Sequence, residues 1–128
     1  MTANLYNFAE KARHATFVCK PFADVFSLAQ KGDIIYCDPP YAPISATANF
    51  TGYATAGFSL AEQSRLADCA ARTAQQHGIP VLISNHDTKL TRQMYQGASL
   101  KELKVGRYIS QKGHARAKVD ELLALYQA

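Results

Sequence analysis

A short apolar run that ends in two prolines constrains the fold of this chain more than any other feature. Ile34-Ile35-Tyr36-Cys37 follows the turn residues Gly32-Asp33, and Asp38-Pro39-Pro40-Tyr41 comes directly after it. An apolar stretch of this length after a turn is typical of a buried parallel strand. Because the prolines prevent the strand from continuing, we expect a rigid loop at its carboxyl end, where open α/β sheets bind ligands.

The residues of this loop suit the chemistry of an exocyclic amine on a nucleobase. Such an amine is a poor nucleophile because its lone pair is delocalised into the ring. If Asp38 accepts one hydrogen and the Pro39 carbonyl accepts the other, the nitrogen moves toward tetrahedral geometry and becomes nucleophilic, while Tyr41 stacks on a base that has left the duplex. The alternative is a proline-stiffened turn in which Asp38 only caps the loop.

Helical and extended patterns alternate along the chain, which predicts an α/β fold. We expect an opening helix whose apolar face carries Leu5, Phe8, Ala9 and Ala12, then a short strand at residues 16–19 and a helix around residues 24–30 before the apolar run.

A longer helix follows, and its ends are marked by local signals. Ser59 and Glu62 have the spacing of a capping box, and Gly78 and Pro80 end the pattern. Its predicted apolar face comprises Leu60, Leu66, Ala67, Ala70, Ala71 and Ala74. In residues 42–57 the apolar residues follow neither the helical nor the strand spacing, and we expect this segment to form a mobile loop.

A second buried parallel strand is predicted at residues 81–84, and Asn85-His86-Asp87 follows it. If the two strands are neighbours, this tripeptide lies beside Asp38. His86 and Asp87 could form a general-base pair, but an amine that becomes cationic when it reacts can lose its proton afterwards and needs no strong base. Alternatively, Asp87 caps a helix that begins near Thr88, and His86 shapes the pocket wall.

Two strands are predicted in the last part of the chain, at residues 103–110 and 119–126. The second segment consists mostly of residues with high helix propensity, so a helix is an equally good prediction there. The segment between them carries Lys112, His114, Arg116 and Lys118, and Arg107 precedes it. These cations predict either a loop that contacts phosphates or an ordinary solvated turn.

Composition is that of a single soluble domain. The 128 residues are 48% apolar, and the net charge of +4 suits a polyanionic partner without identifying one. Cys19, Cys37 and Cys69 are expected to be reduced core residues and not a disulfide or zinc set, so no metal site is expected. The polar N-terminus has no signal-like or membrane-spanning segment, and a cytoplasmic location is expected.

From Phe8 to Tyr126 the chain resembles the C-terminal half of Dam-type DNA adenine-N6 methyltransferases. The resemblance is carried by three blocks in the same order, IIYCDPPYAPISATANFTGY, GIPVLISNHDT and KVDELLALY. It implies a partial Rossmann-like methyltransferase sheet, mostly parallel with one antiparallel strand near the edge. It also implies that residues 119–126 form that strand, that S-adenosylmethionine is the methyl donor, and that adenine in GATC of double-stranded DNA is the target. A bacterial or phage origin would fit.

The resemblance also implies roles for individual residues. Asp38, Pro39 and Tyr41 would be catalytic. Asp38, Phe22 and, less directly, Ser45 would border the cofactor, although Lys20-Pro21 departs from the family pattern before Phe22, which could instead be a core residue. The DNA-contacting residues would be Lys112, Arg116, Lys118 and Arg107.

One departure from the family affects the expected activity. The aromatic-x-Gly-x-Gly loop that cradles the cofactor is missing, as is most of the target-recognition domain. Residues 1–128 are therefore expected to be the C-terminal part of a catalytic domain, inactive alone and completed by the missing half in trans. The alternatives are a catalytically silent DNA-binding remnant and a methyltransferase that acts on RNA or another planar amine.

Overall fold

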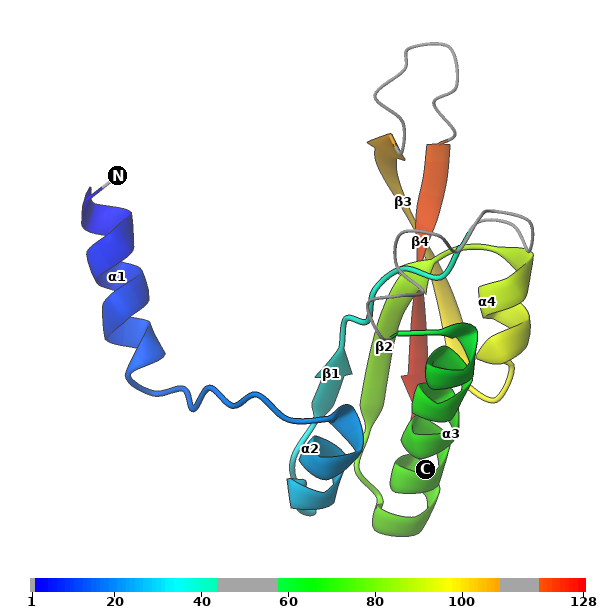
Figure 1. Cartoon of the computed structure of the whole chain (residues 1–128), viewed down its shortest axis with the longest axis horizontal. Coiled ribbons are helices and arrows are strands. Elements are labelled where there is room, and N and C mark those ends of the chain that lie inside the picture. The colour runs from blue at the N-terminus through cyan, green and yellow to red at the C-terminus, as the bar shows by residue number, and fades with distance from the viewer. Residues whose placement is uncertain (1, 44–57, 109–117) are drawn as a thin grey trace.

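The computed structural model describes residues 2–43, 58–108 and 118–128, without the side chains of residues 105–108 and 118 (Figure 1). Most of the loop expected at residues 42–57 lies outside the described residues. Helices and strands alternate as the sequence predicts, so the chain has an α/β fold. The elements in chain order are α1 (Thr2–Ala12), α2 (Phe22–Leu28), β1 (Ile35–Cys37), α3 (Leu60–His77), β2 (Val81–His86), α4 (Lys89–Met94), β3 (Ser99–Tyr108) and β4 (Lys118–Tyr126).

The strands form one mixed sheet with the order β1-β2-β4-β3. β1 and β2 are parallel, whereas β4 runs antiparallel to both of its neighbours, β2 and β3. Three strands therefore share a direction and β4, next to the edge strand β3, runs against them, so that only one of the three described strand pairs is parallel. The helical alternative for residues 119–126 is wrong, because this segment pairs with strands on both sides.

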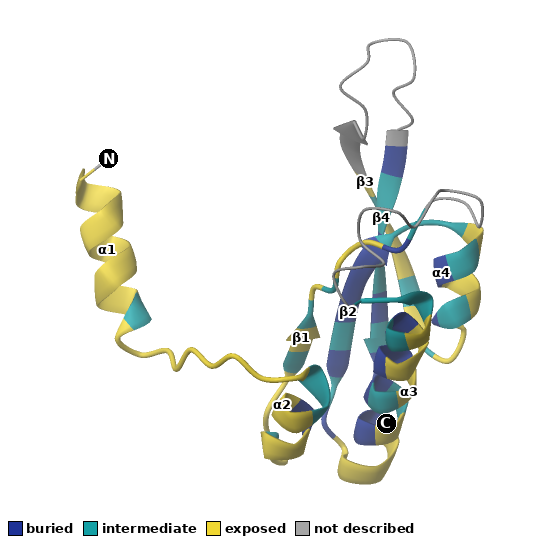
Figure 2. Cartoon of the chain, viewed as in Figure 1, coloured by how far each residue is buried: buried dark blue, intermediate teal, exposed yellow. Residues whose placement is uncertain are grey.

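The core lies between one face of the sheet and the helices α2 and α3, and Tyr95, which follows α4, is buried in it. Figure 2 shows the buried residues gathered on β2, β4 and the inner side of α3. Alternate residues of the central strands point into this core, and the buried side of α3 comprises Gln63, Leu66, Ala67, Ala70, Thr73 and Ala74. Burial of the apolar groups in this core is the main force that holds the layers together.

The predicted ends of α3 are confirmed. The side chain of Ser59 accepts a hydrogen bond from the backbone N–H of Glu62, which satisfies one of the exposed donors of the first turn. At the other end Gly78 adopts a left-handed conformation, with φ of 63°, and its N–H donates to the Ala74 carbonyl. A glycine tolerates this conformation without the strain that a β-carbon would cause.

Two predictions for the N-terminal segment, a strand at residues 16–19 and a buried Cys19, are wrong. Residues 16–19 do not form a strand, and Cys19 is exposed instead of lying in the core. Phe17 and Val18 are 76% and 57% exposed, and within the described part of the chain no strand lies beside them to complete a ladder. An apolar, β-prone sequence forms a strand only where a partner strand supplies the hydrogen bonds.

Both N-terminal helices also differ from their predicted packing or limits. α1 forms, but none of its residues is buried, and Figure 1 shows it apart from the sheet. α2 begins at Phe22, directly after Pro21, and ends at Leu28, earlier than the predicted residue 30. In the described residues, no helix is both long and apolar enough to cross a membrane.

Candidate active site

The Asp38-Pro39-Pro40-Tyr41 loop lies at the carboxyl end of β1, as predicted. Because β1 and β2 are parallel and Cys37 is the register partner of Ile83, the loop lies beside Ser84 and Asn85 near the carboxyl end of β2. The two segments that the sequence placed together are therefore neighbours in the fold.

Asp38 is held from one side by a short chain of hydroxyl groups. The Ser84 hydroxyl donates to Asp38 Oδ1 at 3.3 Å and lies 2.9 Å from the Tyr36 hydroxyl. Ser84 is buried, whereas Asp38 is exposed. A carboxylate has about four acceptor sites on its two oxygens, so this contact leaves Asp38 able to accept hydrogens from a ligand.

Two amide side chains hold the same loop, Asn85 from β2 and Gln63 from α3. Asn85 Oδ1 accepts from the backbone N–H of Ala42 at 2.9 Å, and Gln63 Nε2 donates to the Pro40 carbonyl at 2.5 Å. Both amides are almost fully buried, with 0% and 2% exposure. Since Gln63 occupies the Pro40 carbonyl, the Pro39 carbonyl is the better candidate acceptor for an incoming amine.

Tyr41 already has an aromatic partner within the chain. Its ring stacks on the imidazole of His86, with 3.8 Å between the ring centroids and 18° between the planes, and its hydroxyl donates to Glu121 at 3.4 Å. The ring remains 37% exposed. A target base would therefore meet Tyr41 in a stack that includes His86, an arrangement that the sequence did not predict.

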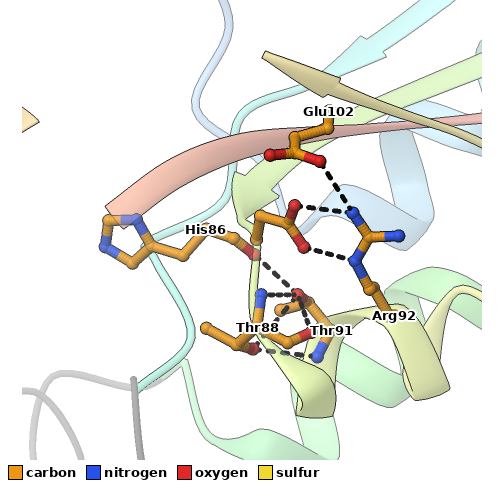
Figure 3. A network of polar contacts seen from close by, with 6 residues as sticks. His86, Thr88, Thr91, Arg92 and Glu102 are labelled. Carbon is orange, nitrogen blue, oxygen red and sulfur yellow. Dashed lines mark hydrogen bonds and ion pairs between the residues drawn. The ribbon is translucent and has the colours of Figure 1, made fainter. Parts of the chain in front are cut away.

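The carboxylate of Asp87, one half of the possible general-base pair with His86, is engaged by a cation from α4. Asp87 binds the guanidinium of Arg92 through both carboxylate oxygens, at 2.6 and 2.7 Å, and Glu102 lies 3.5 Å from the same guanidinium. Figure 3 shows the His86 ring pointing away from Arg92 and Glu102. Asp87 is thus committed to a bidentate ion pair, the stronger form of such a contact.

Asp87 does not cap α4 either, which corrects the sequence interpretation. The N-cap is Thr88, whose side chain accepts from the Thr91 N–H, and the Thr91 side chain accepts in return from the Thr88 N–H (Figure 3). This capping box satisfies donors at the start of α4 from both sides. The Thr91 hydroxyl also donates to the His86 carbonyl at 2.6 Å, which links α4 to the end of β2.

Phe22 and Asp38 line one open depression of about 610 Å³ between α2, β1 and the start of α3. Its remaining wall is mainly apolar and includes Ile35, Phe58 and Leu66, while Lys20 lies at its border. Two of the three residues that the resemblance assigned to the cofactor thus share a cavity. The third, Ser45, lies outside the described residues.

Phe22 is both a pocket residue and a packing residue. Its ring makes edge contacts with Phe26 and Phe58, with centroids 6.3 and 6.1 Å apart, and the Arg65 guanidinium lies 5.2 Å from its centroid. An aromatic wall next to a single carboxylate fits a flat, partly cationic ligand.

Residues 1–109 match the family of D12 class N6 adenine-specific DNA methyltransferases. The chain belongs to this family. It is 58% identical over 119 residues to the DNA adenine methylase of Vibrio cholerae, which covers 93% of this chain and 43% of the relative. It is 57% identical over 125 residues to the Escherichia coli K12 DNA adenine methylase, covering 98% and 45%, and 55% identical over 123 residues to that of Serratia marcescens, covering 96% and 46%. The chain thus spans less than half the length of these relatives.

The basic residues that the family resemblance assigned to DNA are only partly placed. Lys112 and Arg116 lie outside the described residues. Arg107 and Lys118 lie on β3 and β4, where Arg107 pairs with Val119 and Lys118 pairs with Tyr108, but their side chains are not described. Their role in DNA binding stays a prediction.

Burial changes the acid–base properties of two groups behind the site. It raises the pKa of the Cys37 thiol to about 11, with a further contribution from nearby Cys69. Burial also raises the pKa of the Tyr95 phenol, although its hydrogen bond with Asn85 opposes that shift. Both groups are therefore neutral at physiological pH. Among the described residues no cluster of three or more potential metal ligands occurs.

Gln63, Ser84 and Asn85 are site residues to which sequence reasoning gave no role. The signal for Gln63 was present, because it shares the helical spacing of Leu66, Ala67, Ala70 and Ala74 and is, with Thr73, one of two polar residues on that side of α3. A polar residue at a core position needs partners, which are supplied here by the loop and by Asn85. Local sequence offers no signal for which partners these are.

Proposed function

We propose that this chain is the C-terminal part of the catalytic domain of a DNA adenine-N6 methyltransferase and that it supplies the surface that activates the target amine. Its mixed sheet would be part of a Rossmann-like sheet, and its substrate would be the adenine of GATC in double-stranded DNA. The observation that carries the proposal is the placement of Asp38 and the Pro39-Pro40 loop at the carboxyl end of β1, held from both sides by β2 and α3.

Asp38 and Pro39 would act together on the N6 amine. The carboxylate accepts one hydrogen and the Pro39 carbonyl accepts the other, which draws the nitrogen lone pair out of the ring and toward the methyl donor. As the N–C bond formed, the bond between the donor's sulfonium sulfur and the methyl group would break and leave a neutral thioether. The cationic nitrogen would then lose one proton to Asp38 or to water. This chemistry needs no strong base, which is consistent with the pairing of Asp87 with Arg92.

The target adenine must leave the duplex to reach Asp38, and the Tyr41–His86 stack would receive it. Stacking on an aromatic ring contributes roughly 1–3 kcal/mol per base, which offsets part of the extrusion cost. The cations Arg107, Lys112, Arg116 and Lys118 would contact phosphates and set affinity more than sequence choice.

The depression next to Asp38 would hold S-adenosylmethionine, which supplies an electrophilic methyl group when it is bound. Phe22 offers an aromatic surface for the adenine of the cofactor, Asp38 borders its cationic methionine portion, and Ser45 is a further candidate at that border. No aromatic-x-Gly-x-Gly segment occurs in the sequence. We therefore propose that these 128 residues alone bind the cofactor weakly and that a polypeptide segment with this loop is needed to complete the site.

The proposal is tested by reconstituting the chain with a polypeptide that carries the glycine-rich loop and measuring single-turnover methylation of GATC duplex DNA. Asp38→Ala should lower the rate by at least about a hundredfold, the usual cost of losing an acceptor that acts in the transition state. DNA binding should survive, because affinity depends mainly on phosphate contacts.

Asp68→Ala is the matched control, since this exposed carboxylate lies on α3 away from the loop. It should leave the rate unchanged. Methylation by the Asp38→Ala protein at the parental rate would overturn the assigned role of Asp38, and loss of DNA binding in this variant would show a structural effect instead.

A further inference from the structure

We propose that Gln63 is a positioning residue, which acts with Asn85 to fix the geometry of the Asp38-Pro39-Pro40-Tyr41 loop. The inference rests on the proposed function, because the loop is where the amine would be activated. Gln63 lies in the first turn of α3 and Asn85 near the end of β2, so the pair joins two layers of the fold to the loop.

The two amides are bonded to each other as well as to the loop. Asn85 Nδ2 donates to Gln63 Oε1 at 3.2 Å and to the Tyr95 hydroxyl at 3.0 Å, while Asn85 Oδ1 accepts from the N–H groups of Ala42 and His86 at 2.9 and 2.8 Å. Gln63 uses its oxygen for Asn85 and its nitrogen for the Pro40 carbonyl. These contacts fix the orientation of both amide groups.

Gln63 and Asn85 hydrogen-bond to the loop on both sides of Tyr41. The Pro40 carbonyl belongs to the peptide unit before Tyr41, and the Ala42 N–H belongs to the unit after it. Gln63 and Asn85 thus hold both peptide units that flank Tyr41, which leaves its backbone dihedral angles little freedom. The prolines restrict the residues before it, so the direction of the Tyr41 ring and of the Pro39 carbonyl is set by this clamp.

A purely structural role does not account for Gln63 well. Its neighbours on the buried side of α3 are mostly apolar, and an apolar residue there would avoid the cost of desolvating an amide. Buried amides stabilise one arrangement only when their hydrogen bonds are complete, and in the described part of the chain no buried side-chain nitrogen or oxygen lacks a partner. The hydrogen bonds that offset the desolvation of Gln63 are those to the loop and to Asn85.

The first experiment uses the 128-residue chain and measures amide hydrogen exchange by NMR. Gln63→Leu removes both contacts of the amide, whereas Gln63→Glu keeps an acceptor for Asn85 and loses the donor to Pro40. In both variants the Ala42 amide should exchange at least about tenfold faster, while the amides of β2 keep their parental protection. Gln75→Leu, on the exposed side of the same helix, is the matched control and should change neither.

Two results would overturn the proposal. One is parental protection of Ala42 in both Gln63 variants, and the other is an equal loss of protection in β2, which would mark Gln63 as a general stability residue.

The second experiment measures methylation after reconstitution. Gln63→Glu should lower kcat about tenfold or more with little change in the KM for DNA, because it misplaces acceptors that act in the transition state. A change in KM alone would argue against positioning. If the parental complex fails to methylate, the proposed function fails, while the exchange result still decides whether the clamp exists.

Discussion

Among single residues, Cys37 is the group whose burial has the clearest consequence for the pH dependence of stability. Its thiol faces the core beside α3, and burial, together with Cys69, raises its pKa from an ordinary 9.0 to about 11. Burial likewise raises the pKa of the Tyr126 phenol to about 12. The folded chain therefore keeps these protons to higher pH than the unfolded chain does.

We predict that the chain loses stability as the pH rises above about 9. Below that value the Cys37 thiol is protonated in both the folded and the unfolded chain, and between 9 and about 11 it ionises only in the unfolded chain, which favours unfolding. Cys37→Ala should reduce the slope of melting temperature against pH in this range, measured by circular dichroism. Cys19→Ala, at an exposed thiol, is the control and should keep the parental slope. An unchanged slope in the Cys37 variant would contradict the assigned cause.

Among the elements, α4 depends most on a few polar contacts, because it is short and follows directly from β2. Its capping box replaces hydrogen bonds that such a short helix cannot supply internally. The same Thr91 that completes the box bonds to the His86 carbonyl, so the start of α4 and the backbone beneath the Tyr41–His86 stack are coupled.

We predict that Thr88→Ala lowers the free energy of unfolding by about 1 kcal/mol, the usual cost of removing an N-cap side chain. Thr88→Asn should recover most of this loss, since asparagine is an equally good cap. Lys89→Ala, at the exposed first position of α4, should have little effect. The measurement is urea unfolding at a fixed pH. A Thr88→Ala midpoint equal to that of Lys89→Ala would show that the box contributes nothing to stability.

In the molecule as a whole, the edge of the sheet at β1 is open within the described residues. Within the described chain β1 pairs only with β2, so its other edge presents backbone hydrogen-bonding groups. Apolar side chains of β1 and the residue before it are also exposed, with Ile34 at 75% and Tyr36 at 61%. An uncovered edge next to exposed apolar groups is a site for association with another chain.

We predict that the chain alone self-associates in a concentration-dependent manner, measured by light scattering during size-exclusion chromatography. Ile34→Lys should reduce this association, because it places a charge next to the β1 edge at a position that contributes little to the core. Leu5→Lys, at a similarly exposed position on α1, is the control. A monomeric parental chain would contradict the prediction, and an equal effect of the two substitutions would point to general hydrophobicity instead of the edge.

The elements with strong local sequence signals were predicted correctly. The spacing of α3, its Ser59 cap and its Gly78 terminus all depend on residues within a few positions of one another, and all three were confirmed. The apolar runs of β1 and β2 were likewise recognised as neighbouring parallel strands, and their pairing placed the Asp38 loop beside Asn85 and His86. The prediction that the first run is buried was wrong, because β1 comprises only Ile35–Cys37 and, within the described residues, has a neighbour on one side only, so that Ile34 and Tyr36 are exposed. Residues 16–19 show the limit, because an equally apolar run remained unpaired where no neighbouring strand was present in the described chain.

The sequence by itself determined the α/β class, the helix α3 and the position of the candidate amine-activating loop, because each depends on periodicity or on the fixed geometry of proline and glycine. Only the tertiary structure decided that Asp87 binds Arg92, that Tyr41 stacks on His86, and that Gln63 and Asn85 hold the loop. The contacts that hold the loop join residues 23 and 43 positions apart. The type of a side chain fixes which hydrogen bonds it can donate and accept. Which groups become its partners depends on how the layers pack.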